Sequence, residues 1–178
     1  SKEGYIETVD HVRKLKYCQK FENNLDVICK PSIKKCTTKP YTKIRFKPDY
    51  ERLGINGLTN DMKSLMIKRI YDVAAITDKN VKVKYNSELV PVKNLIQYVN
   101  IYLDDSYKKI HEDTGEHWEY IVSLTPSNEF QQVSFVNGIY TSKGGKHVDY
   151  ILNQITKKMI NYIEKKKKIT VSSNIIKE

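Results

Sequence analysis

The stretch TSKGGKHVDYI, residues 141–151, places two adjacent glycines between a hydroxyl-rich turn and a run with the apolar spacing of a helix. Glycine adopts positive φ angles and permits a close backbone approach, so the pair predicts a sharp turn from the preceding strand into that helix. A phosphate-binding P-loop would need a glycine five residues before the second of these and a hydroxyl after the lysine. Tyr140 and His147 occupy those positions. The stretch therefore predicts a structural turn at Gly144 and Gly145.

A long helix is expected after the glycines. Its apolar residues recur at intervals of three and four, which predicts one buried stripe made of Val148, Ile151, Leu152, Ile155, Met159 and Ile163. The helix runs into four consecutive lysines, Lys165, Lys166, Lys167 and Lys168. Cations at a helix C-terminus are favoured by the helix dipole, so a solvated cap is one interpretation. Contact with a phosphate backbone is the other, because it needs charge and reach more than base-edge geometry.

The composition limits the class of protein. With 178 residues and 39% hydrophobic content, the chain can form one or two small domains with real cores. A net charge of +10 favours a polyanionic partner such as nucleic acid, although a lysine-rich composition alone can reflect the genome. No apolar run approaches the length of a membrane span, and no signal peptide is visible. Cys18, Cys29 and Cys36 form no CxxC pair, which favours a reducing compartment.

The pattern of elements divides the chain near residues 77–80. Before that point, YTKIRFKPD predicts a half-exposed strand that ends at Pro48, and a helix capped by Thr59 or Asn60 follows it. After it, residues 81–86 alternate like a strand, and residues 92–103 have a helical apolar face. Residues 117–125 and 130–139 are expected to pair as strands across the turn-forming PSNE. This order predicts a two-layer α/β (α+β) architecture.

Motifs with catalytic or metal chemistry are weak in this chain. The histidines of HEDTGEH, residues 111–117, are six apart across a glycine, whereas the zinc motif HExxH places them four apart on one helix face. The GING at residues 54–57 could clamp a nucleic-acid backbone, but it follows a strand and does not join two helices, so an ordinary loop is favoured. We therefore predict no catalytic residue and no metal ligand.

The extended stretch SFVNGIYTSKGGKHVDYI, residues 134–151, resembles the transducer signature of the eukaryotic-type DNA topoisomerase II, a type IIA family. Four upstream segments resemble that family in the same order: KYCQKFENNL, YTKIRFKPD, MIKRIYDVA and LVPVKNLIQYVNIYL. The resemblance implies that residues 1–77 are the C-terminal part of a GHKL ATPase domain. It also implies that residues 78–178 are a transducer with a fold like domain 2 of ribosomal protein S5, incomplete at its C-terminus.

The function implied by the resemblance is that of one part of an ATP-dependent, DNA-strand-passing isomerase. The family closes as a homodimeric gate around duplex DNA in the nucleus and uses ATP and magnesium. Its nucleotide-binding motifs lie upstream, and a Gln-Thr-Lys loop lies downstream. This fragment alone is therefore expected to bind no cofactor and to be inactive, and no membrane partner is expected.

A DNA-contacting loop is a second family feature implied by the resemblance. In the family, a lysine loop at the end of the long transducer helix contacts DNA, and here it aligns with Glu164, Lys165 and Lys166, with Lys167 and Lys168 beyond. The resemblance thus assigns Lys165–Lys168 as DNA-binding residues, with a glutamate where a lysine is expected. The alternative that the residues leave open is a stand-alone basic α/β module that binds RNA or DNA with no link to ATP.

Overall fold

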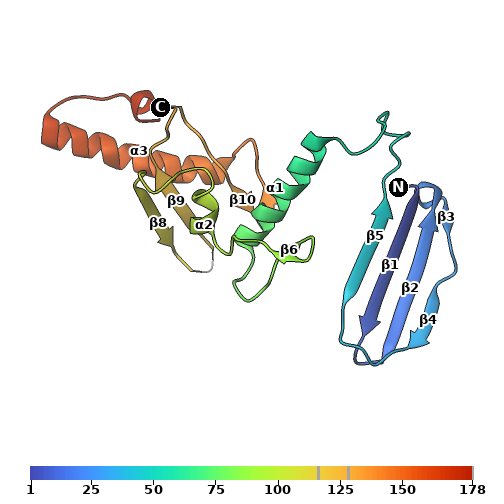
Figure 1. The fold of residues 1–178 in the computed structure, drawn as a ribbon. Helices are drawn as coiled ribbons and strands as arrows, with labels where there is room; N and C mark the ends of the chain where they lie inside the picture. Colours follow the sequence, from blue (N-terminus) through green and yellow to red (C-terminus); the bar gives the residue numbers. More distant parts are fainter. Residues whose placement is uncertain (116, 128, 178) are drawn as a thin grey trace. The chain divides into compact units, whose positions relative to one another are not determined.

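The computed structural model describes residues 1–115, 117–127 and 129–177, and the chain forms two compact units (Figure 1). The first unit is Ser1–Lys63 and the second is Ser64–Glu178. This division falls earlier than the boundary expected at Thr77. The reason is that the apolar end of the helix before Thr77 packs into the core of the second unit. The assignment of residues 1–77 and 78–178 to two domains remains a prediction.

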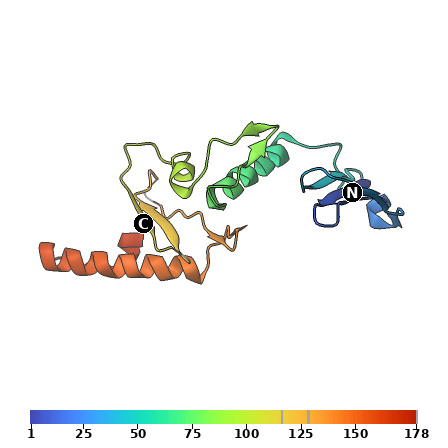
Figure 2. The same cartoon turned by 90° about the horizontal axis from the view of Figure 1, so that it is seen from below.

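The first unit is an antiparallel sheet in the order β3-β2-β1-β5, with β4 also paired to β2. Its strands are β1 Glu3–Asp10, β2 Leu15–Glu22, β3 Val27–Ile28, β4 Ser32–Lys35 and β5 Thr42–Lys47, and a short 3₁₀ turn, η1 Asn23–Leu25, follows β2. Figure 2 shows the same strands from below. The strand predicted to stop at Pro48 is β5, which ends one residue before the proline. Proline has no N–H to continue the ladder, so this end is a local property of the sequence.

A cluster of hydrogen-bonding side chains surrounds one carboxylate, that of Glu7, on this sheet. Glu7 Oε2 accepts hydrogen bonds from the Tyr5 hydroxyl at 2.7 Å and from Lys16 Nζ at 2.9 Å, and Glu7 Oε1 accepts one from the Tyr41 hydroxyl at 2.5 Å. The hydrogen bond from Tyr41, followed by those from Tyr5 and Lys16, lowers the pKa of Glu7 to about 2. The cluster therefore links β1, β2 and the start of β5 through one ionised side chain.

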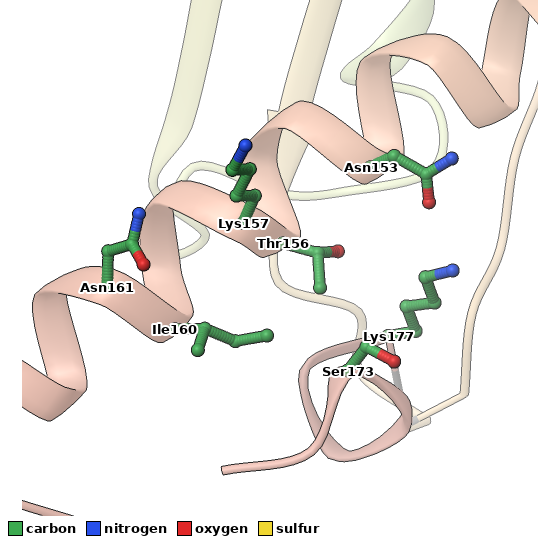
Figure 3. A pocket seen from close by; sticks show the side chains of 7 residues that line it. All are labelled: Asn153, Thr156, Lys157, Ile160, Asn161, Ser173 and Lys177. Atoms are coloured by element: carbon green, nitrogen blue, oxygen red, sulfur yellow. The ribbon is translucent and has the colours of Figure 1, made fainter. Parts of the chain in front are cut away.

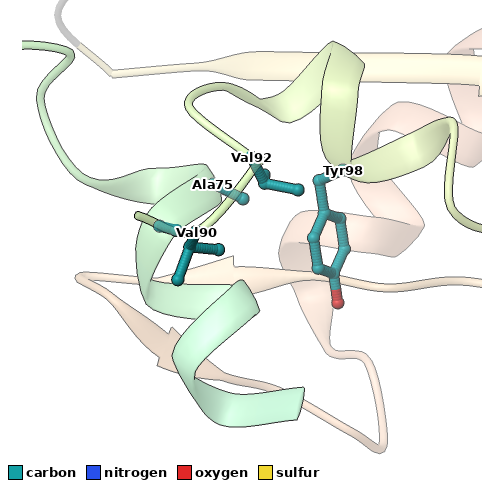
Figure 4. Packing of buried hydrophobic residues seen from close by; sticks show 5 residues of the cluster. Ala75, Val90, Val92 and Tyr98 are labelled. Carbon is teal, nitrogen blue, oxygen red and sulfur yellow. The ribbon is translucent and has the colours of Figure 1, made fainter. Parts of the chain in front are cut away.

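The core of the second unit forms where the helices α1, Asn60–Ile76, and α2, Leu95–Val99, pack against the segment that precedes α2. The helix α1 begins after Thr59, whose hydroxyl accepts a hydrogen bond from Met62 N at 3.2 Å, as an N-cap does. Its Ala74 and Ala75 pack with Val90, Val92 and Tyr98, and Figure 4 shows most of this cluster. Tyr98 comes from α2. The helix expected over residues 92–103 is shorter at both ends. Asn94 caps its start by accepting a hydrogen bond from Gln97 N, and the N–H groups of Ile101 and Tyr102 bond to carbonyls only three residues back, in a tighter turn.

The strand pairing predicted for residues 117–125 and 130–139 is wrong. The strand β9, Glu119–Ser123, pairs with β8, Lys109–Asp113, and β10, Phe135–Val136, pairs with β11, Ile139–Tyr140. The turn explains the second pairing. Asn137 and Gly138 both have positive φ, 49° and 77°, which is the backbone of a two-residue hairpin turn.

The strand expected over residues 81–86 is also shorter than predicted. It is reduced to β6, Lys84–Tyr85, which pairs with β7, Glu88–Leu89. Asn86 and Ser87 between them have φ angles of 49° and 71°, so a tight turn replaces the continuing strand.

The chain ends in α3, Lys146–Lys167, and the short α4, Ser173–Lys177. The long helix predicted after the glycines is thereby confirmed. Its apolar stripe is half-buried and not fully buried, and Met159 is 42% exposed. Within the described ranges, no helix has the length and apolarity that crossing a membrane requires.

Candidate functional site

The C-terminal end of α3 presents the tetralysine predicted from the sequence. Lys165, Lys166 and Lys167 form the last turn, and Lys168 caps the helix in the left-handed conformation with φ 56° and ψ 33°. The Lys168 N–H donates to Glu164 O at 3.0 Å. All four lysines are exposed, and no carboxylate in the described part of the chain forms a salt bridge with any of them. Four ammonium groups are therefore available within one helical turn.

The opposite end of α3 is fixed by the turn at Gly144 and Gly145. Their φ angles are 71° and 147°, and Gly144 N donates to Thr141 O at 2.9 Å. A Cβ at Gly145 would lie 3.1 Å from His147 Cε1 and 3.2 Å from its Nδ1. The His147 ring also lies within 3.2 Å of the Thr141 hydroxyl through Nε2. The turn thus joins the β10–β11 hairpin to the start of α3 with little room for a side chain.

A buried ionic centre, which the sequence analysis did not identify, lies in the second unit. Asp72 on α1 is 2% exposed, and its carboxylate accepts hydrogen bonds from Lys68 Nζ at 2.9 Å and from the Tyr98 hydroxyl at 2.6 Å. Lys68 Nζ also lies 4.1 Å from the centre of the Tyr140 ring. Burial first, and then the hydrogen bond with Asp72, raises the pKa of Tyr98. The Lys-Asp spacing of four residues on a helix was the one available signal.

Residues considered for metal binding do not meet in a cluster. His111 Nε2 lies 3.0 Å from Glu119 Oε1 across the β8–β9 hairpin, and the three cysteines are free thiols. Among the residues with described positions, no three His, Cys, Asp or Glu side chains could hold a metal ion together. The turn before α3 also lacks the hydroxyl that would complete a P-loop.

Comparison with known proteins identifies the family. A family model described as DNA gyrase B matches residues 68–178. The DNA topoisomerase 2 of Arabidopsis thaliana is 42% identical over 177 residues, which covers 94% of this chain and 12% of that protein. The chain belongs to the DNA gyrase B family. Within it, the resemblance to eukaryotic topoisomerase II predicted from the sequence is confirmed.

Solved structures confirm the fold. The ATPase region of Saccharomyces cerevisiae topoisomerase II superposes with a TM-score of 0.89 at 37% identity, over 99% of this chain and 46% of that chain. The ATPase and transducer domains of DNA topoisomerase II from Balamuthia mandrillaris superpose with a TM-score of 0.91 at 34% identity, again over 99% and 46%. The predicted mixed α/β fold of ATPase and transducer parts is confirmed. The chain spans less than half of either solved chain.

Proposed function

We propose that the chain is part of an ATP-dependent type II DNA topoisomerase, in which it couples ATP-driven closure of a protein gate to the passage of one DNA duplex through another. The match to topoisomerase relatives along nearly the whole chain supports this proposal. In that role the complete protein works as a homodimer in the nucleus and uses ATP and magnesium. The residues described here supply the coupling element and a DNA contact.

The observation that carries the DNA contact is the exposed tetralysine Lys165–Lys168 at the end of α3. DNA phosphates attract ammonium groups regardless of sequence, and this suits an enzyme that acts on any duplex. The helix has 22 residues, so at 1.5 Å per residue its ends are roughly 33 Å apart. In the proposed role, a movement at the glycine turn would reach the lysines through this continuous helix.

The alternative of a stand-alone nucleic-acid-binding module has less support. It accounts for the charge of +10 and the exposed lysines equally well. It does not account for a sequence that follows topoisomerase relatives through both units. The two functions differ in whether DNA changes ATP turnover.

The test is to extend the reading frame from the native transcript in both directions and to purify the complete protein. The proposal expects a glycine-rich nucleotide lid upstream, a Gln-Thr-Lys loop downstream, and ATP hydrolysis that DNA stimulates. Changing Lys165, Lys166 and Lys167 to alanine should reduce that stimulation and leave the basal rate nearly intact. A complete protein without ATP hydrolysis would favour the stand-alone module instead.

A further inference from the structure

A polar hollow of about 220 Å³ lies between α3 and α4 (Figure 3). Ile160 is its apolar wall, and the other lining side chains are hydrogen-bonding or cationic: Asn153, Thr156, Lys157, Asn161, Ser173 and Lys177. In Figure 3, Asn153 and Thr156 extend from α3 toward Ser173 and Lys177 on α4. No carboxylate is among the described lining residues, and Lys177 supplies a positive charge.

Thr156 places a buried hydroxyl, without a hydrogen-bond partner among the described residues, beside the hollow. The residue is 4% exposed, and its hydroxyl has no hydrogen-bond partner in the part of the chain that the structure describes. A buried hydroxyl without a partner is unfavourable, and such groups in native structures call for an explanation. Because the hydroxyl oxygen itself is buried, a rotation of the Thr156 side chain is needed to bring it into contact with a ligand oxygen in the hollow.

Lys177 gives the hollow an uncompensated charge. It is half-buried, and it forms no salt bridge with any carboxylate of the described residues. An ammonium group beside a buried hydroxyl donor suits an oxyanion, because hydrogen bonds from a charged donor to a charged acceptor are the stronger ones. Lys157 also lines the hollow, but its ammonium group points away from Ser173 and Lys177 (Figure 3).

We propose that the hollow between α3 and α4 binds a phosphate group through Thr156, Ser173 and Lys177. The site is separate from the tetralysine, since Lys157 and Lys165 are roughly 12 Å apart along α3 at 1.5 Å per residue. Its phosphate comes either from a DNA backbone or from free inorganic phosphate, and the same donors recognise both. The free-phosphate arm stands without the proposed function, whereas the DNA arm rests on it.

The first arm titrates the chain with inorganic phosphate at constant ionic strength and follows the amide signals of α3 and α4 by NMR. Thr156→Val keeps the side-chain shape and removes the hydroxyl, and Lys177→Gln removes the charge. Each should weaken binding by about tenfold, the factor that loss of a hydrogen bond to a charged group implies. Lys146→Gln, on the same helix but outside the hollow, should bind like the unchanged chain.

The second arm measures the affinity for a DNA duplex. If free phosphate does not bind but Thr156→Val and Lys177→Gln weaken duplex binding more than Lys146→Gln does, the site takes a backbone phosphate. Thermal unfolding checks the fold, and Thr156→Val should be no less stable because it removes an unpaired hydroxyl. Failure of both variants to change either affinity would overturn the phosphate site. Loss of DNA binding on changing Lys165, Lys166 and Lys167, with phosphate binding retained, would separate the two proposals.

Discussion

The Tyr98 hydroxyl donates a 2.6 Å hydrogen bond to the buried Asp72 carboxylate and thereby joins α2 to α1. Both side chains are only 2% exposed, and residues 72 and 98 are far apart in the sequence. Lys68 neutralises the carboxylate from the same helix at 2.9 Å. A buried charge is tolerated only when it is paired and hydrogen-bonded, so this contact is expected to control how α2 docks in the second unit.

Tyr98→Phe should destabilise the second unit by about 1–3 kcal/mol, since it keeps the ring and leaves a buried carboxylate one donor short. Chemical denaturation followed by circular dichroism measures the difference. Tyr162→Phe is the matched control, because Tyr162 is 64% exposed, and it should change stability by less than about 0.5 kcal/mol. Equal stabilities of the Tyr98 variant and the unchanged chain would mean that Lys68 alone satisfies Asp72.

Gly145→Ala should destabilise the second unit by about 1–3 kcal/mol, because an alanine at φ 147° is strained and its Cβ would meet the His147 ring at 3.1 Å. The control is Gly57→Ala, whose Cβ would have no atom within 4 Å. That control should leave the unfolding temperature unchanged or slightly raise it. A Gly145 variant that melts like the control would show that the turn tolerates a side chain.

Low pH should lower the free energy of unfolding of the first unit, because Glu7 becomes protonated. The folded-state pKa of Glu7 is lowered from 4.5 to about 2, so its contribution is complete above pH 4.5 and is lost as the pH falls toward 2. Glu7→Gln should therefore lower the free energy of unfolding above pH 4.5. It should also flatten the fall of that free energy with decreasing pH, measured by chemical denaturation at a series of pH values. Glu3→Gln, on the same strand, is the control and should retain that fall. If the two variants lost stability identically as the pH falls, Glu7 would not be the group whose protonation weakens the first unit.

Local signals in the sequence predicted the elements that local chemistry determines. The apolar spacing of α3, the end of β5 at Pro48 and the Thr59 cap each depend on residues a few positions apart. The partner of β9 could not be predicted in the same way, because pairing depends on contacts between distant segments. The Asn137-Gly138 turn was a local hairpin signal that the expectation of a long strand obscured.

The features of the candidate site also divide into those that neighbouring residues determine and those that depend on contacts between distant segments. The tetralysine was predictable, because four adjacent lysines at the end of a periodic helix must lie together wherever the helix packs. The hollow beside Thr156 was not predictable, because Ser173 and Lys177 come to it only when α4 folds back onto α3. For the same reason, no sequence pattern indicated that the Thr156 hydroxyl would be buried without a partner.

The most direct test of the DNA contact is the salt dependence of duplex binding. Each lysine-phosphate contact contributes about 0.9 to the slope of log affinity against log salt concentration. Changing Lys165, Lys166 and Lys167 to alanine should flatten that slope by about two to three units and weaken binding on all sequences alike. Changing the exposed Lys79, Lys82 and Lys84 to alanine alters the charge equally and should leave the slope within about one unit of the original. Equal slopes for the unchanged chain and the Lys165–Lys167 variant would contradict the contact and make the tetralysine a solvated helix cap.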